Sequence, residues 1–178
     1  MDRDNFRPGP LAEVARVPAD ERWDLVFVRD LRHPPEKVWA ALTEPDQLAQ
    51  WAPFVASRDL GTPGDATLST VDGDQTWPEP ATVVRTERPS LLEYSWGDGL
   101  LRWELTPTGT GTRLTLRHRI DRPDLAPQMA AGWHLCLDVA DHLLAGDPVG
   151  PIRGAEAKDF GWDELRDAYA ERLDQPPA

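Results

Sequence analysis

Four imidazole and carboxylate groups stand close together in the last third of the chain and could bind a metal ion. They are His134, Asp138, Asp141 and His142, at spacings that place them on one face of a helix. Imidazole nitrogen and carboxylate oxygen are ligands of zinc and related ions. The sequence has no further cluster of such residues, and this face lies opposite the apolar face of the same helix. We therefore expect a solvated helix face and no metal site.

Two other residues are candidates for a catalytic role on their own, His118 and Cys136. His118 stands among apolar strand positions, where it would act as a general acid or base only beside a bound ligand. A core histidine hydrogen-bonded to a backbone carbonyl is the alternative, and we favour it. Cys136 adjoins the apolar helix face with no basic residue three or four positions away, which predicts an inert buried thiol rather than a nucleophile.

Sequence motifs for nucleotide, serine-hydrolase or zinc-protease chemistry are absent. The two G-x-G runs, Gly97-Asp98-Gly99 and Gly109-Thr110-Gly111, fall between expected strands, where tight turns explain them. We therefore expect no cofactor.

Composition excludes several classes of protein. A length of 178 residues fits one domain, and an excess of Asp and Glu (31) over Lys and Arg (19) gives a net charge of −12. Such a charge repels phosphate backbones, so we expect no nucleic-acid partner. The sequence has neither an apolar stretch long enough to span a bilayer nor a signal peptide, and its one cysteine cannot form an internal disulfide. These features predict a cytoplasmic protein without membrane insertion.

The period of the hydrophobic pattern predicts the order of the elements. Val14 and Val17 suit a short strand, and alternation over 23–28 predicts another. Helical spacing over 36–42 predicts a short helix after Pro34 and Pro35. A capping-box pattern beginning at Thr43 predicts a second short helix that ends before Pro53.

Alternation returns between 56 and 120 and predicts an antiparallel meander of strands. Helical spacing then predicts one long helix over 129–144, a loop over 146–161 and a short amphipathic helix over 162–173. Because the apolar face of the sheet and the apolar face of the long helix must each be buried against another element, we predict an α+β fold in which they pack together. Its curved antiparallel sheet wraps around the long C-terminal helix, and two short helices follow the first strand.

Several stretches resemble the family of activators of the 90-kDa heat shock protein ATPase and its bacterial members, within the SRPBCC superfamily of START-like domains and the birch pollen allergen. The stretch over 29–51, which includes His33-Pro34-Pro35-Glu36-Lys37-Val38-Trp39, resembles the family's opening signature. Further similar stretches are 89–96, 111–116 and Gly132-Trp133. The resemblance covers roughly Trp23 to Gly146 and implies a helix-grip fold, which we expect over residues 11–146. The polar, Pro- and Gly-bearing stretch 1–10 predicts a flexible arm before it. Residues 147–178 are expected to form an appendage with a short docking helix.

The helix-grip fold implies a cavity between sheet and long helix that accepts an apolar or amphipathic small molecule. The candidate lining residues are apolar and aromatic, with one histidine: Trp77, Tyr94, Trp96, Trp103, Leu105, Leu116, His118, Met129, Trp133 and Leu137. The alternative is that these side chains fill a solid core. The abundance of Trp favours a pocket, because an indole N–H needs a partner or water when it is buried.

The leading hypothesis is a binding protein for a hydrophobic or aromatic small molecule, such as a polyketide or a lipid. The resemblance implies three alternatives. One is a polyketide cyclase or aromatase, with His118, Tyr94 and Arg102 as the first residues to test. Another is a self-resistance protein that captures an enediyne or polyketide antibiotic, and the third is a co-chaperone-like module with a protein partner.

Two further expectations concern stability. Trp39 and Trp51 should anchor the two short helices on the sheet. Charged residues that alternate with apolar ones should form an exposed cross-strand ladder: Arg102, Glu104, Arg113, Arg117 and Arg119.

Overall fold

Strand β8 (Gly111–Ile120) alternates half-buried and buried residues along its whole length, which is the pattern of a strand with one face on a core. The computed structural model describes residues 3–174. In it β8 lies within an eight-stranded antiparallel sheet of order β1-β2-β8-β7-β6-β5-β4-β3. The other strands are β1 (Glu13–Ala19), β2 (Arg22–Leu31), β3 (Phe54–Ala56), β4 (Gly64–Asp72), β5 (Gln75–Glu87), β6 (Leu91–Trp96) and β7 (Gly99–Thr108).

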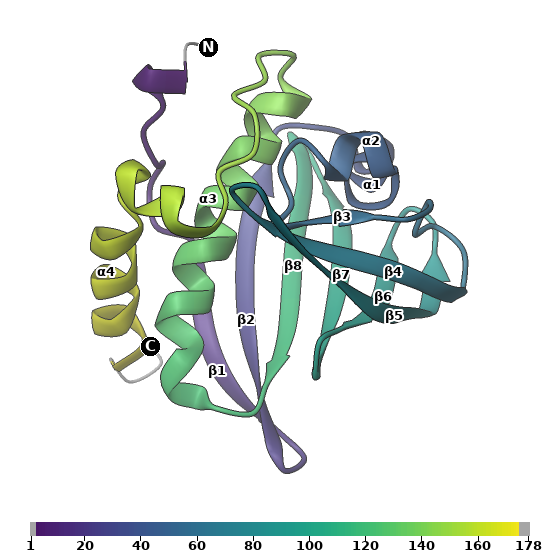
Figure 1. The fold of residues 1–178 in the computed structure, drawn as a ribbon, viewed down its shortest axis with the longest axis horizontal. Helices are drawn as coiled ribbons and strands as arrows, with labels where there is room; N and C mark the ends of the chain where they lie inside the picture. Colours follow the sequence, from purple (N-terminus) through teal and green to yellow (C-terminus); the bar gives the residue numbers. More distant parts are fainter. Residues whose placement is uncertain (1–2, 175–178) are drawn as a thin grey trace.

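The long helix α3 (Ala126–Leu144) lies across the inner face of this curved sheet, as Figure 1 shows. Its apolar residues meet Leu25, Phe27 and Leu116 of the sheet in one continuous core. The predicted α+β architecture, a curved antiparallel sheet around a long C-terminal helix, is confirmed. None of the helices within residues 3–174 is both long and apolar enough to cross a membrane.

Helices α1 (Pro35–Thr43) and α2 (Pro45–Leu48) follow β2 and cover one end of the sheet (Figure 1). Trp39 and Trp51 are buried beneath them, and the Trp51 indole Nε1 donates a 2.9 Å hydrogen bond to the Ala41 carbonyl. The predicted capping box is wrong. The Thr43 hydroxyl donates to the Trp39 carbonyl at 3.0 Å, so Glu44 takes the N-cap position of α2 without a side-chain hydrogen bond.

The N-terminal segment is docked on the domain from Arg3 onward, whereas the sequence pattern indicated a flexible arm; Met1 and Asp2 lie outside the described residues. A short 3₁₀ turn, η1 (Arg3–Asn5), is followed by Phe6, which is fully buried against the rings of His142 and Phe160. The Arg3 guanidinium also donates to the Pro151 carbonyl at 2.8 Å. These contacts with residues 142–160 hold the N-terminal segment in place, and residues so far away in sequence could not be recognised from the local pattern.

The appendage, described as far as residue 174, packs beside α3 and also contacts the sheet at β1 and β4. It contains a 3₁₀ segment, η3 (Gly154–Phe160), within the predicted loop, and the predicted helix α4 (Trp162–Asp174), in which Leu165 and Tyr169 are buried. Another 3₁₀ turn, η2 (Pro123–Leu125), leads into α3. Figure 1 shows α4 beside α3, and α4 also contacts the edge strand β1.

The outer face of the sheet carries the predicted cross-strand ladder of charges. Arg102 pairs with Glu104 at 2.7 Å and with Glu93 at 3.3 Å, and Arg119 pairs with Asp24 at 2.8 Å. The partly exposed pairs of Arg102 contribute little each, about 0–1 kcal/mol, whereas Asp24 is a buried partner. They make this face polar and leave the inner face as the place for an apolar site.

Candidate functional site

An aromatic cluster fills the space between the sheet and α3. Trp96 stacks on His118, with ring centroids 5.8 Å apart and planes 29° apart. Trp133, on α3, makes edge-to-face contacts with both Trp96 and Trp103. Alternation along β6, β7 and β8 turns the strand members of the cluster inward, and the helical spacing of α3 turns Trp133 towards them.

His118 is a buried member of this cluster, and its partner differs from the expectation. The Trp133 indole Nε1 donates a 3.1 Å hydrogen bond to His118 Nδ1, in place of the predicted bond to a backbone carbonyl. Burial lowers the pKa of His118 to about 4, although the nearby carboxylate of Asp24 acts in the opposite direction. The imidazole is therefore neutral near pH 7.

A pocket of about 420 Å³ opens beside the cluster, where the β6–β7 turn approaches the start of α3. Its wall is aromatic and apolar, with Trp96, His118 and Met129 among the lining residues. Charged groups that line it include the exposed Asp98, Asp121 and Arg122. The pocket thus has an apolar wall and a charged rim.

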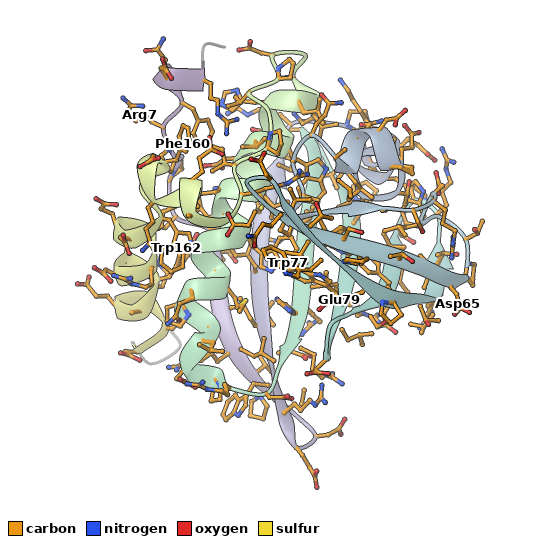
Figure 2. All side chains as sticks on the ribbon, viewed as in Figure 1. Arg7, Asp65, Trp77, Glu79, Phe160 and Trp162 are labelled. Atoms are coloured by element: carbon orange, nitrogen blue, oxygen red, sulfur yellow. The ribbon has the colours of Figure 1, made fainter. Side chains whose placement is uncertain are left out.

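A smaller hollow of about 160 Å³ lies on the other side of Trp96 and Met129 and also contacts Trp133. Its outer wall belongs to the appendage and includes Ile152 and Trp162. Figure 2 labels Trp162 at the start of α4, beside α3. Residues beyond the family domain therefore form part of the surroundings of the aromatic cluster.

Most of the remaining predicted lining residues lie deeper, in close-packed surroundings. These buried residues are Tyr94, Trp103, Leu105, Leu116 and Leu137. The Trp103 indole donates to the Tyr94 hydroxyl at 3.1 Å, so two polar groups satisfy each other inside the core. Of the predicted set, the structure places Trp96, His118 and Met129 on the larger pocket, and Trp133 on the smaller one.

Trp77 lies apart from this group. It occupies β5 on the same face as Glu79, and both residues are labelled in Figure 2. It pairs in register with Thr70 near the tip of the β4–β5 hairpin, and its side chain is 47% exposed. The structure therefore places Trp77 at the surface and not in the wall of either pocket.

The three residues considered for catalysis do not form one site. Tyr94 is buried, which raises the pKa of its hydroxyl far above the usual range. Arg102 lies on the outer face, where it pairs with Glu93 and Glu104. Alternation along adjacent strands separates these groups, and His118 is the member of the three that lines the larger pocket.

The prediction of a solvated face on α3 is wrong for His134 and Asp138. Both are buried, because the N-terminal segment and α4 cover that face. Nδ1 of His134 lies 2.7 Å from the Tyr169 hydroxyl, and the carboxylate of Asp138 accepts a 2.8 Å hydrogen bond from Gly9 N and pairs with Arg29.

The other two residues of that face are more accessible, and Asp141 pairs with His33 at 2.8 Å. Within the described residues, no group of three or more His, Cys, Asp and Glu side chains is placed to hold a metal ion. Cys136 is buried, and burial raises the pKa of its thiol to about 12, partly offset by nearby Arg153. These surroundings keep the thiol protonated and inert.

Sequence reasoning missed part of the pocket wall. Leu125, Ile120 and Gly99 join Trp96 and His118 in lining the pocket. Gly99 is the first residue of β7 and has no side chain that could mark a face, and Leu125 stands in the 3₁₀ turn η2, where neither strand nor α-helical periodicity applies. The G-x-G turn at Gly97 and Gly99 was the one available signal, and it indicated only a tight turn.

Comparison with known proteins identifies relatives of this fold. CalU16 from Micromonospora echinospora superposes with a TM-score of 0.67 at 20% identity, over 92% of this chain and 98% of that one. The conserved protein of unknown function EF2215 from Enterococcus faecalis superposes with a TM-score of 0.68 at 18% sequence identity, over 90% of each chain. The protein encoded by gene BPP1335 of Bordetella parapertussis superposes with a TM-score of 0.65 at 23% sequence identity, over 97% of this chain and 95% of that one. At these identities the likeness shows the fold alone.

No curated protein matches the chain in sequence. The family described as Activator of Hsp90 ATPase homolog 1-like protein matches residues 32–145, more than half of the chain. This match runs from the end of β2 to the end of α3, and it confirms the resemblance and the helix-grip fold. The chain belongs to the family of Activator of Hsp90 ATPase homolog 1-like proteins.

Proposed function

We propose that this protein binds a hydrophobic or aromatic small molecule in the pocket between the sheet and α3. The observation that carries the proposal is the pocket of about 420 Å³ walled by Trp96, His118 and Met129. Small-molecule sites are typically hollows of roughly this size, mostly apolar, with a few polar groups that orient the ligand. The family fold supports the same function, since hydrophobic ligand binding is a general property of such folds. Polyketides and lipids are the ligand classes we propose first.

A titration with an uncharged fluorescent dye, N-phenyl-1-naphthylamine, tests the proposal. Met129→Arg places a charge in the pocket wall, and we expect it to weaken dye binding roughly tenfold or more, because a charge without a partner resists burial. Val17→Arg is the matched control. Val17 is exposed on β1, so the same new charge should leave dye affinity unchanged.

Two outcomes would contradict this function. One is the absence of saturable dye binding, together with native mass spectra of protein from its own host that contain no small molecule. The other is an equal loss of dye affinity in Met129→Arg and Val17→Arg, which would mean that the dye binds elsewhere.

Catalysis of the cyclase or aromatase type is the second candidate, and it rests on His118. A neutral imidazole in the wall of an apolar pocket can move a proton of a bound substrate. Turnover of an aromatic polyketide precursor that disappears in His118→Phe, while that variant still binds the precursor, would support this role. Equal turnover in His118→Phe and the wild type would exclude a catalytic role for His118.

A further inference from the structure

The two nitrogens of His118 have different surroundings, and these determine which one carries the proton. Nδ1 accepts a hydrogen bond from the Trp133 indole Nε1 at 3.1 Å. An indole N–H only donates, so Nδ1 must present its lone pair. In a neutral imidazole the hydrogen then sits on Nε2. Burial keeps this ring neutral near pH 7, since it lowers the pKa of His118 to about 4.

The Nε2–H of His118 has room in front of it. Among residues 3–174, the hydrogen-bond partner of the His118 ring is Trp133, and its indole N–H bonds to Nδ1 and not to Nε2. A Cβ at Gly99, which also lines the pocket, would lie 3.4 Å from Nε2 and 2.7 Å from the Arg119 carbonyl oxygen. A side chain at position 99 would therefore crowd Nε2, and glycine leaves this space open.

The donor stands beside a flat aromatic wall. The Trp96 ring stacks on the His118 ring, and both residues line the pocket. A planar ligand that packs on the same face of Trp96 as His118, beside the imidazole, would present its edge to the edge of that ring. An oxygen at that edge would be an acceptor for Nε2–H.

We propose that His118 sets the specificity of this pocket by donating a hydrogen bond from Nε2–H to the carbonyl oxygen of an uncharged aromatic ketone or quinone. The inference rests on the proposed function of the pocket. Trp133 is the positioning residue, because its indole N–H holds the tautomer that makes Nε2 the donor. A ligand without an acceptor would leave this buried donor unpaired, and sites built around such a donor discriminate against ligands that lack the acceptor.

A matched pair of planar ligands tests the inference. 9-Fluorenone and fluorene have the same tricyclic frame and differ by a carbonyl in place of a methylene group. We expect the protein to bind fluorenone about two- to tenfold more tightly, the ratio that corresponds to one net hydrogen bond. A purely apolar pocket would favour fluorene, the more hydrophobic of the two. The affinities are measured by displacement of the naphthylamine dye.

Three variants assign the preference to the hydrogen bond. His118→Phe retains a ring without the N–H and should abolish the preference for fluorenone. His118→Gln supplies an amide N–H near the position of Nε2 and should restore part of it. Trp133→Phe removes the donor that fixes the tautomer, so the preference should decrease although His118 is intact. Val17→Arg, outside the pocket, should show the wild-type ratio.

The outcomes separate this inference from the function on which it rests. If neither ligand binds and the dye does not bind, the proposed function fails. If both ligands bind with equal affinity, or fluorene binds more tightly, the pocket is real and the assignment to His118 is overturned. If His118→Phe does not fold, the ratio in Trp133→Phe decides, and an unchanged ratio there overturns the inference.

Discussion

The phenol oxygen of Tyr169, on α4, lies 2.7 Å from Nδ1 of His134, in the middle of α3. The same oxygen accepts a 3.0 Å hydrogen bond from the backbone N–H of Ala12, just before β1. Tyr169 and His134 are both fully buried. One hydroxyl group thus joins the appendage, the long helix and the N-terminal segment.

Replacing Tyr169 with Phe should destabilise the protein by about 1–3 kcal/mol, because it leaves the Ala12 N–H and His134 Nδ1 buried without a partner. Chemical denaturation measures the change. Glu171→Gln, at an exposed position of the same helix, is the control and should change stability by less than about 0.5 kcal/mol. Equal stability of Tyr169→Phe and the wild type would show that the hydroxyl does not join these segments.

Stability should fall as the pH is lowered from about 6.5 to about 4. Burial lowers the pKa of both His118 and His134 to about 4, with Arg29 acting in the same direction on His134. In the unfolded chain a histidine has a pKa of about 6.5, so in this window the unfolded state binds protons that the folded state does not. Each histidine therefore contributes a slope of up to about 1.4 kcal/mol per pH unit, and the dependence levels off above the window.

Urea unfolding at steps between about pH 6 and pH 5 measures this slope, above the range in which most carboxylates titrate. His118→Gln removes one of the two groups and should reduce the slope to about half, whatever its effect on stability at pH 7. A slope that is the same in His118→Gln and the wild type would mean that His118 takes up its proton in the folded state as well.

Truncating Trp39 or Trp51 to Ala should cost about 3–5 kcal/mol, because both side chains are buried beneath the two short helices. Trp77→Ala is a matched control, since this Trp is 47% exposed and should change stability far less. Denaturant unfolding compares the three variants. A change below about 1 kcal/mol for Trp39 or Trp51 would contradict the anchoring role.

Replacing Trp133 with Ala should alter dye affinity as well as stability. The indole lines the smaller hollow and packs against Trp96, which borders both pockets, so its removal should enlarge the space open to a ligand. A residue that lines an existing pocket gives up fewer packing contacts than one in a solid core. Unchanged dye affinity with a stability loss of about 3–5 kcal/mol would assign Trp133 to the core alone.

The sheet and the long helix could be predicted because their signals are local. Alternation from Leu114 to Ile120 and helical spacing from Met129 to Leu144 are properties of neighbouring residues, and the structure contains β8 and α3 at these places. The alternation along β8 likewise turns Leu114, Leu116, His118 and Ile120 inward, as the burial pattern of the strand shows.

The burial of Phe6, His134 and Asp138 could not be predicted in this way. Phe6 and Asp138 are covered by segments more than 120 positions away in sequence, as in the hydrogen bond from Gly9 N to Asp138, and His134 is covered by Tyr169, 35 positions away on another helix. A polar helix face looks the same in sequence whether water or another helix covers it. Only the docking of the N-terminal segment and α4 determined that this face is buried.

The sequence by itself determined which side chains of β6, β7 and β8 point towards the core, because residue type and strand phase suffice to orient them. The tertiary structure decided which of them pack solidly and which border open space, as the contrast between Trp103 and Trp96 shows. It also decided which nitrogen of His118 carries the proton, since a neutral imidazole donates from one nitrogen and a donor bonded to the other determines which one that is. That partner is Trp133, and its indole reaches His118 because α3 packs across the sheet.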